Sequence, residues 1–291
     1  MKITKHIAFF YREDRLNYLS QMIQAANTYP FYTDIYIHTN VLFDTDTLEK
    51  PTNGKVFLIG HNLTKKDPMR LPWYVRPLME AQKDAYDIFI YVEDDILIPR
   101  SAIDYWLKYK DICIRNDCNL GFFRMETDSE GKEYISDLHN EHSVSQQLNK
   151  ICNIERQPFV INDVNPYVAF WIYDQNEFKR FLESPAWDVS TLLKWYDDRA
   201  ACAIGMHFIR NPDFRIYKHT VLPLTPLFRV YPDARVYHIP SNYVDVPYCY
   251  FATLLFDEAL PRKQDEIVTP KMTIERKHAR LIRTGKVSPT Q

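Results

Sequence analysis

The segment from Asp87 to Pro99, DIFIYVEDDILIP, constrains the fold more than any other part of this sequence. Five apolar residues, rich in β-branched and aromatic types, precede three consecutive acidic residues, and a second apolar run follows at once. A short apolar run of this kind is typical of a strand buried on both faces of a mostly parallel sheet. Because a buried charge without a partner is strongly disfavoured, the acidic residues need a positive group beside them.

The acidic residues Glu93, Asp94 and Asp95 are suited to binding a divalent cation. On an extended chain Glu93 and Asp95 point to one side and Asp94 points to the other. Magnesium and manganese ions prefer carboxylate oxygens, so Glu93 and Asp95 on one side predict a binding site for such an ion. The alternative is a loop of acids that are solvated or paired with arginine, and the triplet alone does not decide between the two.

Composition narrows the class of protein. The 291 residues, 46% of them hydrophobic, suffice for a large core in one large α/β domain or in two small ones. A formal net charge of −2 lacks the basic footprint of a nucleic-acid-binding domain, so we expect no nucleic-acid partner. The five cysteines form no Cys-x-x-Cys pair, and no apolar run reaches the roughly 18 residues of a membrane span. We therefore expect a soluble, cytoplasmic protein with reduced thiols and no transmembrane segment.

Glycine is scarce, with six residues in the whole chain. The sequence contains neither a Gly-x-Gly-x-x-Gly fingerprint nor a Gly-rich loop of the P-loop type. If the chain binds a nucleotide, a metal ion must therefore neutralise the phosphates that a Gly-rich loop would otherwise cradle. This absence strengthens the metal interpretation of the acidic triplet.

Predicted strands and helices alternate through the first part of the chain. The strands cover residues 6–11, 34–39, 55–59 and 88–92, and the helices cover residues 14–26, 72–85 and 99–113. Strand, helix and strand in this order open a βαβ unit, whose crossover is almost always right-handed. The acidic triplet then lies at the carboxyl end of a strand, the edge at which open α/β sheets bind ligands.

The later part of the chain continues the same pattern without an internal repeat or a low-complexity linker. Its predicted elements are strands at 120–126, 159–161, 167–173 and 234–239, a hairpin turn at 128–131, and helices at 174–184 and 190–205. We therefore expect a single α/β domain with a mostly parallel central sheet flanked by helices.

With the acidic triplet in this place, the chain resembles the glycosyltransferases of the GT-A fold, including their exostosin-like members. Their DxD-type motif corresponds here to Glu93-x-Asp95, which departs from the commonest form by having Glu first. The resemblance implies a nucleotide-diphospho-sugar transferase fold over residues 1–291. It divides the chain into a nucleotide-binding half (5–100), an acceptor half (101–245) and a C-terminal extension (246–291).

The same resemblance implies the chemistry. It predicts transfer of a sugar from a nucleotide-sugar donor, often a UDP-sugar, to a glycan, polysaccharide or lipid-linked acceptor, with Mn²⁺ or Mg²⁺ as the cofactor. Asp95 is expected to bind the metal, while Glu93 and Asp94 contribute to the ribose or to the surroundings of the metal. Many members supply a late histidine as a third ligand, and His238 is the candidate. The competing interpretation of His238 is a strand-end residue bonded to the backbone.

Further residues are assigned to the donor by their location in the family. Phe10, Tyr11 and Arg12 occupy the first strand-to-helix loop, which cups the nucleobase and ribose in these enzymes. Arg76, one helix before the acidic triplet, matches a basic residue directed toward the diphosphate. The alternative for Arg76 is an ion pair with Glu80, one helical turn further on.

The catalytic carboxylate stays open between three residues. Inverting transfer needs a general base on the acceptor hydroxyl, and Asp197 or Asp198 lies late in the chain, as the base does in many such enzymes. The alternative for this pair is a structural contact with Arg199. Glu126, at the end of a predicted strand, is the other candidate acid. Inverting and retaining mechanisms both remain possible, and exostosin-like members are retaining.

Other functions compete with glycosyl transfer. A sugar-nucleotide-forming nucleotidyltransferase needs a Gly-rich first loop, which residues 9–14 (FFYRED) do not provide. A two-metal phosphoesterase needs additional scattered acid or histidine ligands. The last alternative is a non-catalytic binding protein on the same fold, which only a demonstrated enzymatic activity would exclude.

Overall fold

The computed structural model describes residues 1–63, 68–138, 148, 150–162, 165–188, 198–207, 218–244, 246, 252 and 254–256. The chain divides into two compact units. The first comprises residues 1–103, 167–205 and 236–240, and the second comprises residues 104–166, 206–235 and 241–291.

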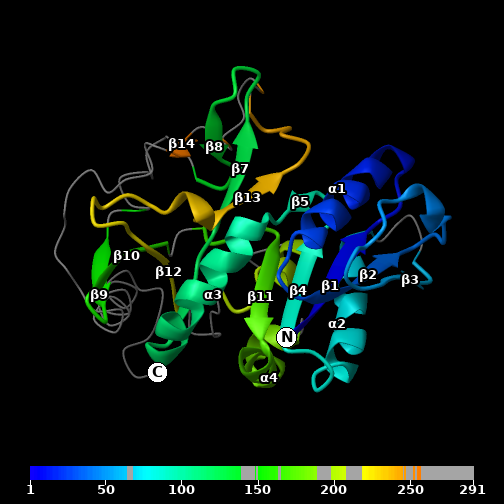
Figure 1. Cartoon of the computed structure of the whole chain (residues 1–291), viewed down its shortest axis with the longest axis horizontal. Helices are drawn as coiled ribbons and strands as arrows, with labels where there is room; N and C mark the ends of the chain where they lie inside the picture. Colours follow the sequence, from blue (N-terminus) through cyan, green and yellow to red (C-terminus); the bar gives the residue numbers. More distant parts are fainter. Residues whose placement is uncertain are drawn as a thin grey trace, which may run out of the picture. The chain divides into compact units, whose positions relative to one another are not determined.

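The first unit contains a five-stranded sheet in the order β11-β4-β1-β2-β3 (Figure 1). Its strands are β1 (Lys2–Phe9), β2 (Tyr32–Thr39), β3 (Val56–Gly60), β4 (Ile88–Glu93) and β11 (Phe170–Asp174). The first four are parallel to their neighbours and β11 is antiparallel to β4. All six residues of β4 are buried, which confirms the prediction of a central strand covered on both faces. The mostly parallel sheet with flanking helices confirms the α/β class.

Helices of the first unit cover both faces of this sheet. Helix α1 (Leu16–Asn27) buries Leu19, Met22, Ile23 and Ala26, a spacing that places them on one helical face. Helix α2 (Leu71–Ala81) starts with a proline in its first turn, where the missing N–H costs no helical bond. Side chains of β1 alternate between the faces. Lys5 reaches Met22 in α1, and His6 reaches Gln82 at the end of α2, so the two helices lie on opposite faces.

Two shorter helices complete the first unit. Helix α4 (Gln175–Glu183) is capped by Asp174, whose carboxylate accepts a hydrogen bond from the Glu177 N–H at 2.9 Å, within the helix predicted over 174–184. Helix α5 (Asp198–Ala203) lies within the span predicted as a helix over 190–205, of which residues 190–197 lie outside the described residues. Gly205 follows it with a positive φ of 55°, which suits glycine as a C-terminal helix stop.

Several predicted boundaries were wrong. Helix α1 begins at Leu16 and not at residue 14, because a short 3-10 helix (Glu13–Arg15) precedes it, in which the Asp14 carboxylate binds Arg12. Helix α2 ends at Ala81, four residues before the predicted end. In the second unit, the strand predicted over 120–126 is divided into β6 (Cys118–Leu120) and β7 (Phe123–Thr127). Gly121 lies between them, where a Cβ atom would come within 2.8 Å of Thr220.

The second unit is built mainly from short antiparallel pairings. One sheet has the order β6-β12-β10-β9, with β9 at Ile151–Ile154, β10 at Gln157–Ile161 and β12 at His219–Pro223. Strand β7 pairs with β8 (Glu133–Ile135) around the predicted hairpin turn, and β14 (Leu254–Leu255) pairs with β8. Helix α3 (Arg100–Arg115) starts in the first unit and continues into the second. In the described part of the chain no helix is both long and apolar enough to span a membrane.

Candidate functional site

The acidic triplet lies at the carboxyl end of β4, in the first unit. Glu93 ends the strand, and Asp94 and Asp95 form the turn into β5 (Ile96–Leu97). All three carboxylate residues are buried, with exposed fractions of 5%, 8% and 8%. The turn thus holds negative charge where water is largely excluded, which requires compensation by nearby positive or donor groups.

The late strand β13 (Arg235–His238) brings a histidine to this turn. Strand β5 pairs with it antiparallel, with His238 opposite Ile96. The Ile239 N–H donates to the Asp95 carbonyl at 2.8 Å, and His238 Nε2 lies 3.6 Å from Asp95 Oδ2. Backbone pairing therefore fixes the imidazole beside the Asp95 carboxylate.

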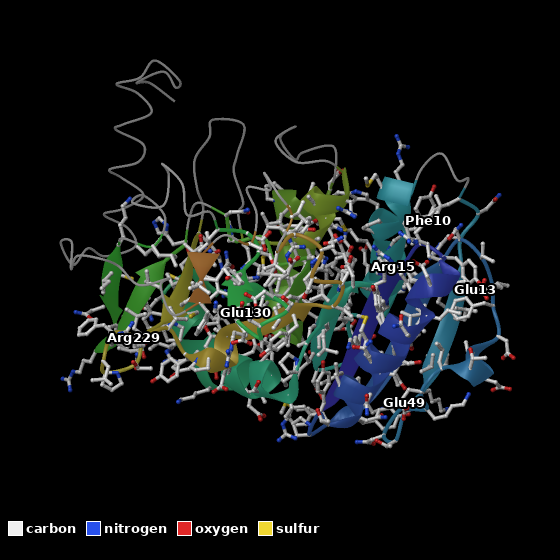
Figure 2. All side chains as sticks on the ribbon, turned by 90° about the horizontal axis from the view of Figure 1, so that it is seen from above. Phe10, Glu13, Arg15, Glu49, Glu130 and Arg229 are labelled. Carbon is white, nitrogen blue, oxygen red and sulfur yellow. The ribbon has the colours of Figure 1, made fainter. Side chains whose placement is uncertain are left out.

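A residue that the sequence analysis missed supplies the positive charge. Arg15 lies just before α1, and its Nη1 is 3.2 Å from both carboxylate oxygens of Asp94 and 3.4 Å from Asp95 Oδ2. Figure 2 shows Arg15 with Phe10 and Glu13 around the N-terminal end of α1. One guanidinium nitrogen thus faces three carboxylate oxygens.

The electrostatics of the turn are finely balanced. Burial, followed by the neighbouring Asp95 carboxylate, raises the pKa of Asp94 to about 7, although Arg15 opposes this rise. Burial lowers the pKa of Arg15, but attraction by Asp94 and Asp95 outweighs it, so that the pKa lies above its ordinary value. When both carboxylates are ionised, their negative charge exceeds the positive charge of one arginine. The raised pKa of Asp94 reflects this excess, so the turn favours binding of a proton or of another cation.

Glu93 does not share these partners, contrary to the expected pairing of Glu93 with Asp95 on one side. Its Oε1 accepts a hydrogen bond from the Tyr167 hydroxyl at 3.0 Å, and its Oε2 lies 3.7 Å from Arg199 Nε. The alternation of an extended chain ends at Glu93, because Asp94 and Asp95 belong to a turn. Asp94 and Asp95, rather than Glu93 and Asp95, converge on one cation.

The donor set of the turn suits a hard divalent cation in its chemistry. The carboxylate oxygens of Asp94 and Asp95 are the ligand type that Mg²⁺ and Mn²⁺ prefer, and the neutral imidazole of His238 is a common metal ligand in general. No group of three or more His, Cys, Asp or Glu residues among the described ones is arranged to hold a metal ion. The guanidinium of Arg15 is instead the cation that stands between the carboxylates.

The loop predicted to cup the nucleobase presents aromatic rings. The Tyr11 ring lies 5.5 Å from that of Phe43 and 5.9 Å from that of Phe9, and the Tyr11 N–H donates to Asn40 Oδ1 at 2.8 Å. Phe10 is partly exposed, while Arg12 is exposed and binds Asp14 through two hydrogen bonds. The loop therefore has a fixed backbone and rings at its surface.

Arg76 is held by protein groups rather than by an acid. Its guanidinium lies 4.1 Å from the Trp73 ring centroid, 4.7 Å from that of Trp187 and 5.2 Å from that of Phe181. It donates to the carbonyls of Ala186, Trp187 and Cys202. These contacts, and not the alternative pair with Glu80, fasten α2 to its surroundings. A role of Arg76 toward a diphosphate stays a prediction.

The candidate catalytic acids are placed unequally. In the second unit, Glu126 is buried, and its Oε2 accepts hydrogen bonds from the N–H groups of Tyr243 at 2.8 Å and Val244 at 2.7 Å. Asp197 lies outside the described residues, and Asp198 is described only by its backbone at the start of α5. Glu126 therefore orders a backbone segment, and its catalytic role, like that of the two aspartates, stays a prediction.

A scan against models of protein families found no match, and a search of curated proteins found none either.

Proposed function

We propose that this chain is a metal-dependent glycosyltransferase of the GT-A type, which moves a sugar from a nucleotide-sugar donor to a carbohydrate or lipid-linked acceptor. The observation that carries the proposal is the buried acidic turn at the carboxyl end of β4, a central strand of a mostly parallel sheet. Open α/β sheets bind their ligands at this edge, beyond the carboxyl ends of the strands. A UDP-sugar is the donor class that we propose first.

Under this proposal, the described residues of the acidic turn and of the first loop have different roles. Asp94, Asp95 and His238 would hold the divalent ion, which supplies positive charge against the diphosphate leaving group when it is bound. Glu93 is buried and hydrogen-bonded to Tyr167, so it supports the strand end instead of facing Arg15. Arg15 offers a planar, permanently charged fork, the side chain best suited to a phosphate oxygen pair. The rings of Tyr11 and Phe43 provide a surface for a nucleobase.

Thermal unfolding in the presence of nucleotides tests the proposal. We expect UDP or GDP with Mn²⁺ to raise the melting temperature of the wild-type protein, because a ligand that binds the folded state stabilises it. The substitution Asp95→Asn, which keeps the shape and removes the charge, should abolish this rise. The matched control Asp46→Asn changes an acid with an 87% exposed side chain and should leave the rise intact.

Nucleotide release from a panel of sugar nucleotides separates an enzyme from a binding protein. Loss of turnover with retained nucleotide binding in Asp197→Asn or Asp198→Asn would identify the base. Because Glu126 holds two backbone N–H groups, turnover of Glu126→Gln must be read beside its melting temperature. The proposal fails if no nucleoside diphosphate shifts the melting curve with any divalent ion.

A further inference from the structure

Arg15 occupies the place that a divalent ion would take between Asp94 and Asp95. A single nitrogen, Nη1, lies 3.2 Å from both oxygens of Asp94 and 3.4 Å from Asp95 Oδ2. Magnesium and manganese bind such oxygens at about 2.1 Å, within the space that the guanidinium fills. A metal ion and this guanidinium therefore compete for the same carboxylates.

Without a bound ligand, the protein already provides the cation that would compete with a metal ion. Two buried carboxylates need a positive partner when no ligand is present, and Arg15 meets that need from within the chain. The Arg15 side chain is itself 23% exposed, against 12% for Asp94 and 11% for Asp95. It approaches from the solvent side, beside the ring of Tyr18 at 5.9 Å. The guanidinium can thus leave toward a ligand without crossing the core.

A diphosphate is the group that would draw Arg15 away. Phosphate oxygens accept paired hydrogen bonds from a guanidinium, with geometry that matches a carboxylate. When Arg15 turns from the carboxylates to a phosphate, it opens the space for a metal ion that the phosphate also binds. After the exchange, the divalent ion lies beside the two carboxylates and Arg15 lies beside the diphosphate, so each anionic group has a cation next to it.

We propose that Arg15 is an exchangeable internal counter-ion, which makes the divalent metal and the nucleoside diphosphate bind tightly only together. The part concerning the diphosphate rests on the proposed function, whereas the competition between Arg15 and the metal does not. Linkage requires the coupling to be mutual, so each ligand strengthens the other by the same factor. A factor of about 10 lies within the usual range for such coupling.

Binding of Mn²⁺ to the full chain, followed by the electron paramagnetic resonance signal of the free ion, tests the inference. Without nucleotide, Arg15→Gln should bind Mn²⁺ about 10-fold more tightly than the wild type, while Arg15→Lys, which keeps the charge, should resemble the wild type. UDP should tighten Mn²⁺ binding to the wild type and have a much smaller effect on Arg15→Gln. Arg115→Gln is the matched control, because Arg115 binds the exposed Glu155 instead of the buried acids and has no place in the candidate site.

The outcomes distinguish this inference from the proposed function. Equal or weaker Mn²⁺ binding by a folded Arg15→Gln overturns the inference, even if nucleotide binding depends on metal. Tighter Mn²⁺ binding by Arg15→Gln without any response to nucleotides supports the competition but contradicts the glycosyltransferase proposal. If Arg15→Gln does not fold, the wild type decides alone: Mn²⁺ binding that is absent even in the presence of UDP, or that UDP leaves unchanged, overturns the coupling.

Discussion

Lys5 is a buried cation whose removal should stabilise the protein. It lies in the middle of β1 with no exposed surface, where its Nζ donates to the Met22 carbonyl at 3.1 Å and lies 5.5 Å from the Tyr29 ring centroid. Burial lowers the pKa of Lys5 from 10.5 to about 7. The folded state therefore binds the proton of Lys5 more weakly than the unfolded chain does.

The size of the effect follows from this difference. As the pH falls from 10.5 to about 7, the free-energy cost of the charged Lys5 in the folded state grows by about 1.4 kcal/mol per pH unit. It reaches about 5 kcal/mol below pH 7. The cation–ring contact and the carbonyl bond return about 2 kcal/mol of it. Since methionine has nearly the same length and no charge, Lys5→Met should raise the free energy of unfolding by about 3 kcal/mol near pH 6.5. The sign is fixed: a lowered pKa of a base costs stability below the unfolded pKa and costs nothing above it.

Urea denaturation, followed by circular dichroism at pH 6.5 and pH 10, measures the difference. The advantage of Lys5→Met should shrink to about 1 kcal/mol or less at pH 10, where Lys5 is neutral when folded and partly neutral when unfolded. Lys55→Met, at an exposed position before β3, should show no such dependence. An equal advantage at both pH values, or a loss of stability at pH 6.5, would refute the reasoning.

Three further predictions concern stability. The wild-type free energy of unfolding should fall by about 2.7 kcal/mol per pH unit below pH 6.5, because burial lowers the pKa of His6 to about 3 and of His38 to about 2; urea midpoints at pH 6.5, 5.5 and 4.5 measure it. Arg124→Met should cost about 3–5 kcal/mol in denaturant titrations, because it removes the partner of a buried carboxylate held through two hydrogen bonds. Gly205→Ala should lower the melting temperature more than Gly131→Ala does. Both residues have positive φ, but a Cβ at Gly205 would meet two aromatic side chains of β11 within 2.8 Å, whereas a Cβ at Gly131 would meet no atom within 4 Å.

The buried histidines explain why acid should act so strongly. His6 Nδ1 lies 2.9 Å from His38 Nε2, and His38 Nδ1 lies 2.8 Å from His61 Nε2. With the Gln82 amide oxygen as the acceptor for His6 Nε2, each neutral ring donates through Nε2 and accepts through Nδ1 along the chain of rings. A proton added to any of these rings breaks that sequence of donors and acceptors. The row extends across β1, β2 and the end of β3.

Much of the fold could be predicted from the sequence because its signals are local. The apolar run before Glu93 indicates a covered strand, and the spacing of Leu19, Met22, Ile23 and Ala26 indicates a helix with one buried face. Both depend on neighbours within a few residues. The same local rule failed at the acidic turn, because strand alternation says nothing once the chain leaves the strand.

The site itself depends on contacts that local patterns do not contain. Arg15 and Asp95 are separated by 80 residues in the sequence, and the parallel order of β1 and β4 brings their loops to one edge. The sequence predicted that edge and the acids on it. It did not predict which arginine forms the ion pairs with them, because Arg12 and Arg15 look equivalent in the sequence. The first binds its neighbour Asp14 and the second binds the buried acids. Side-chain direction at the start of a helix decided between them.

Three buried or half-buried cations of the first unit point to the same conclusion about function. Lys5 is held by a carbonyl and a ring, and Arg76 is held by rings and carbonyls, so their described partners are groups that also stabilise the core. Arg15 is held instead by Asp94 and Asp95, whose carboxylate oxygens are the ligand type that a hard divalent ion prefers. Replacing Lys5 or Arg76 by a ligand would disrupt packing, whereas under the proposal a metal ion would replace Arg15 and leave the strands in place. The cation that we propose to be exchangeable is therefore the one at the carboxyl edge of the sheet, the edge at which open α/β sheets bind ligands.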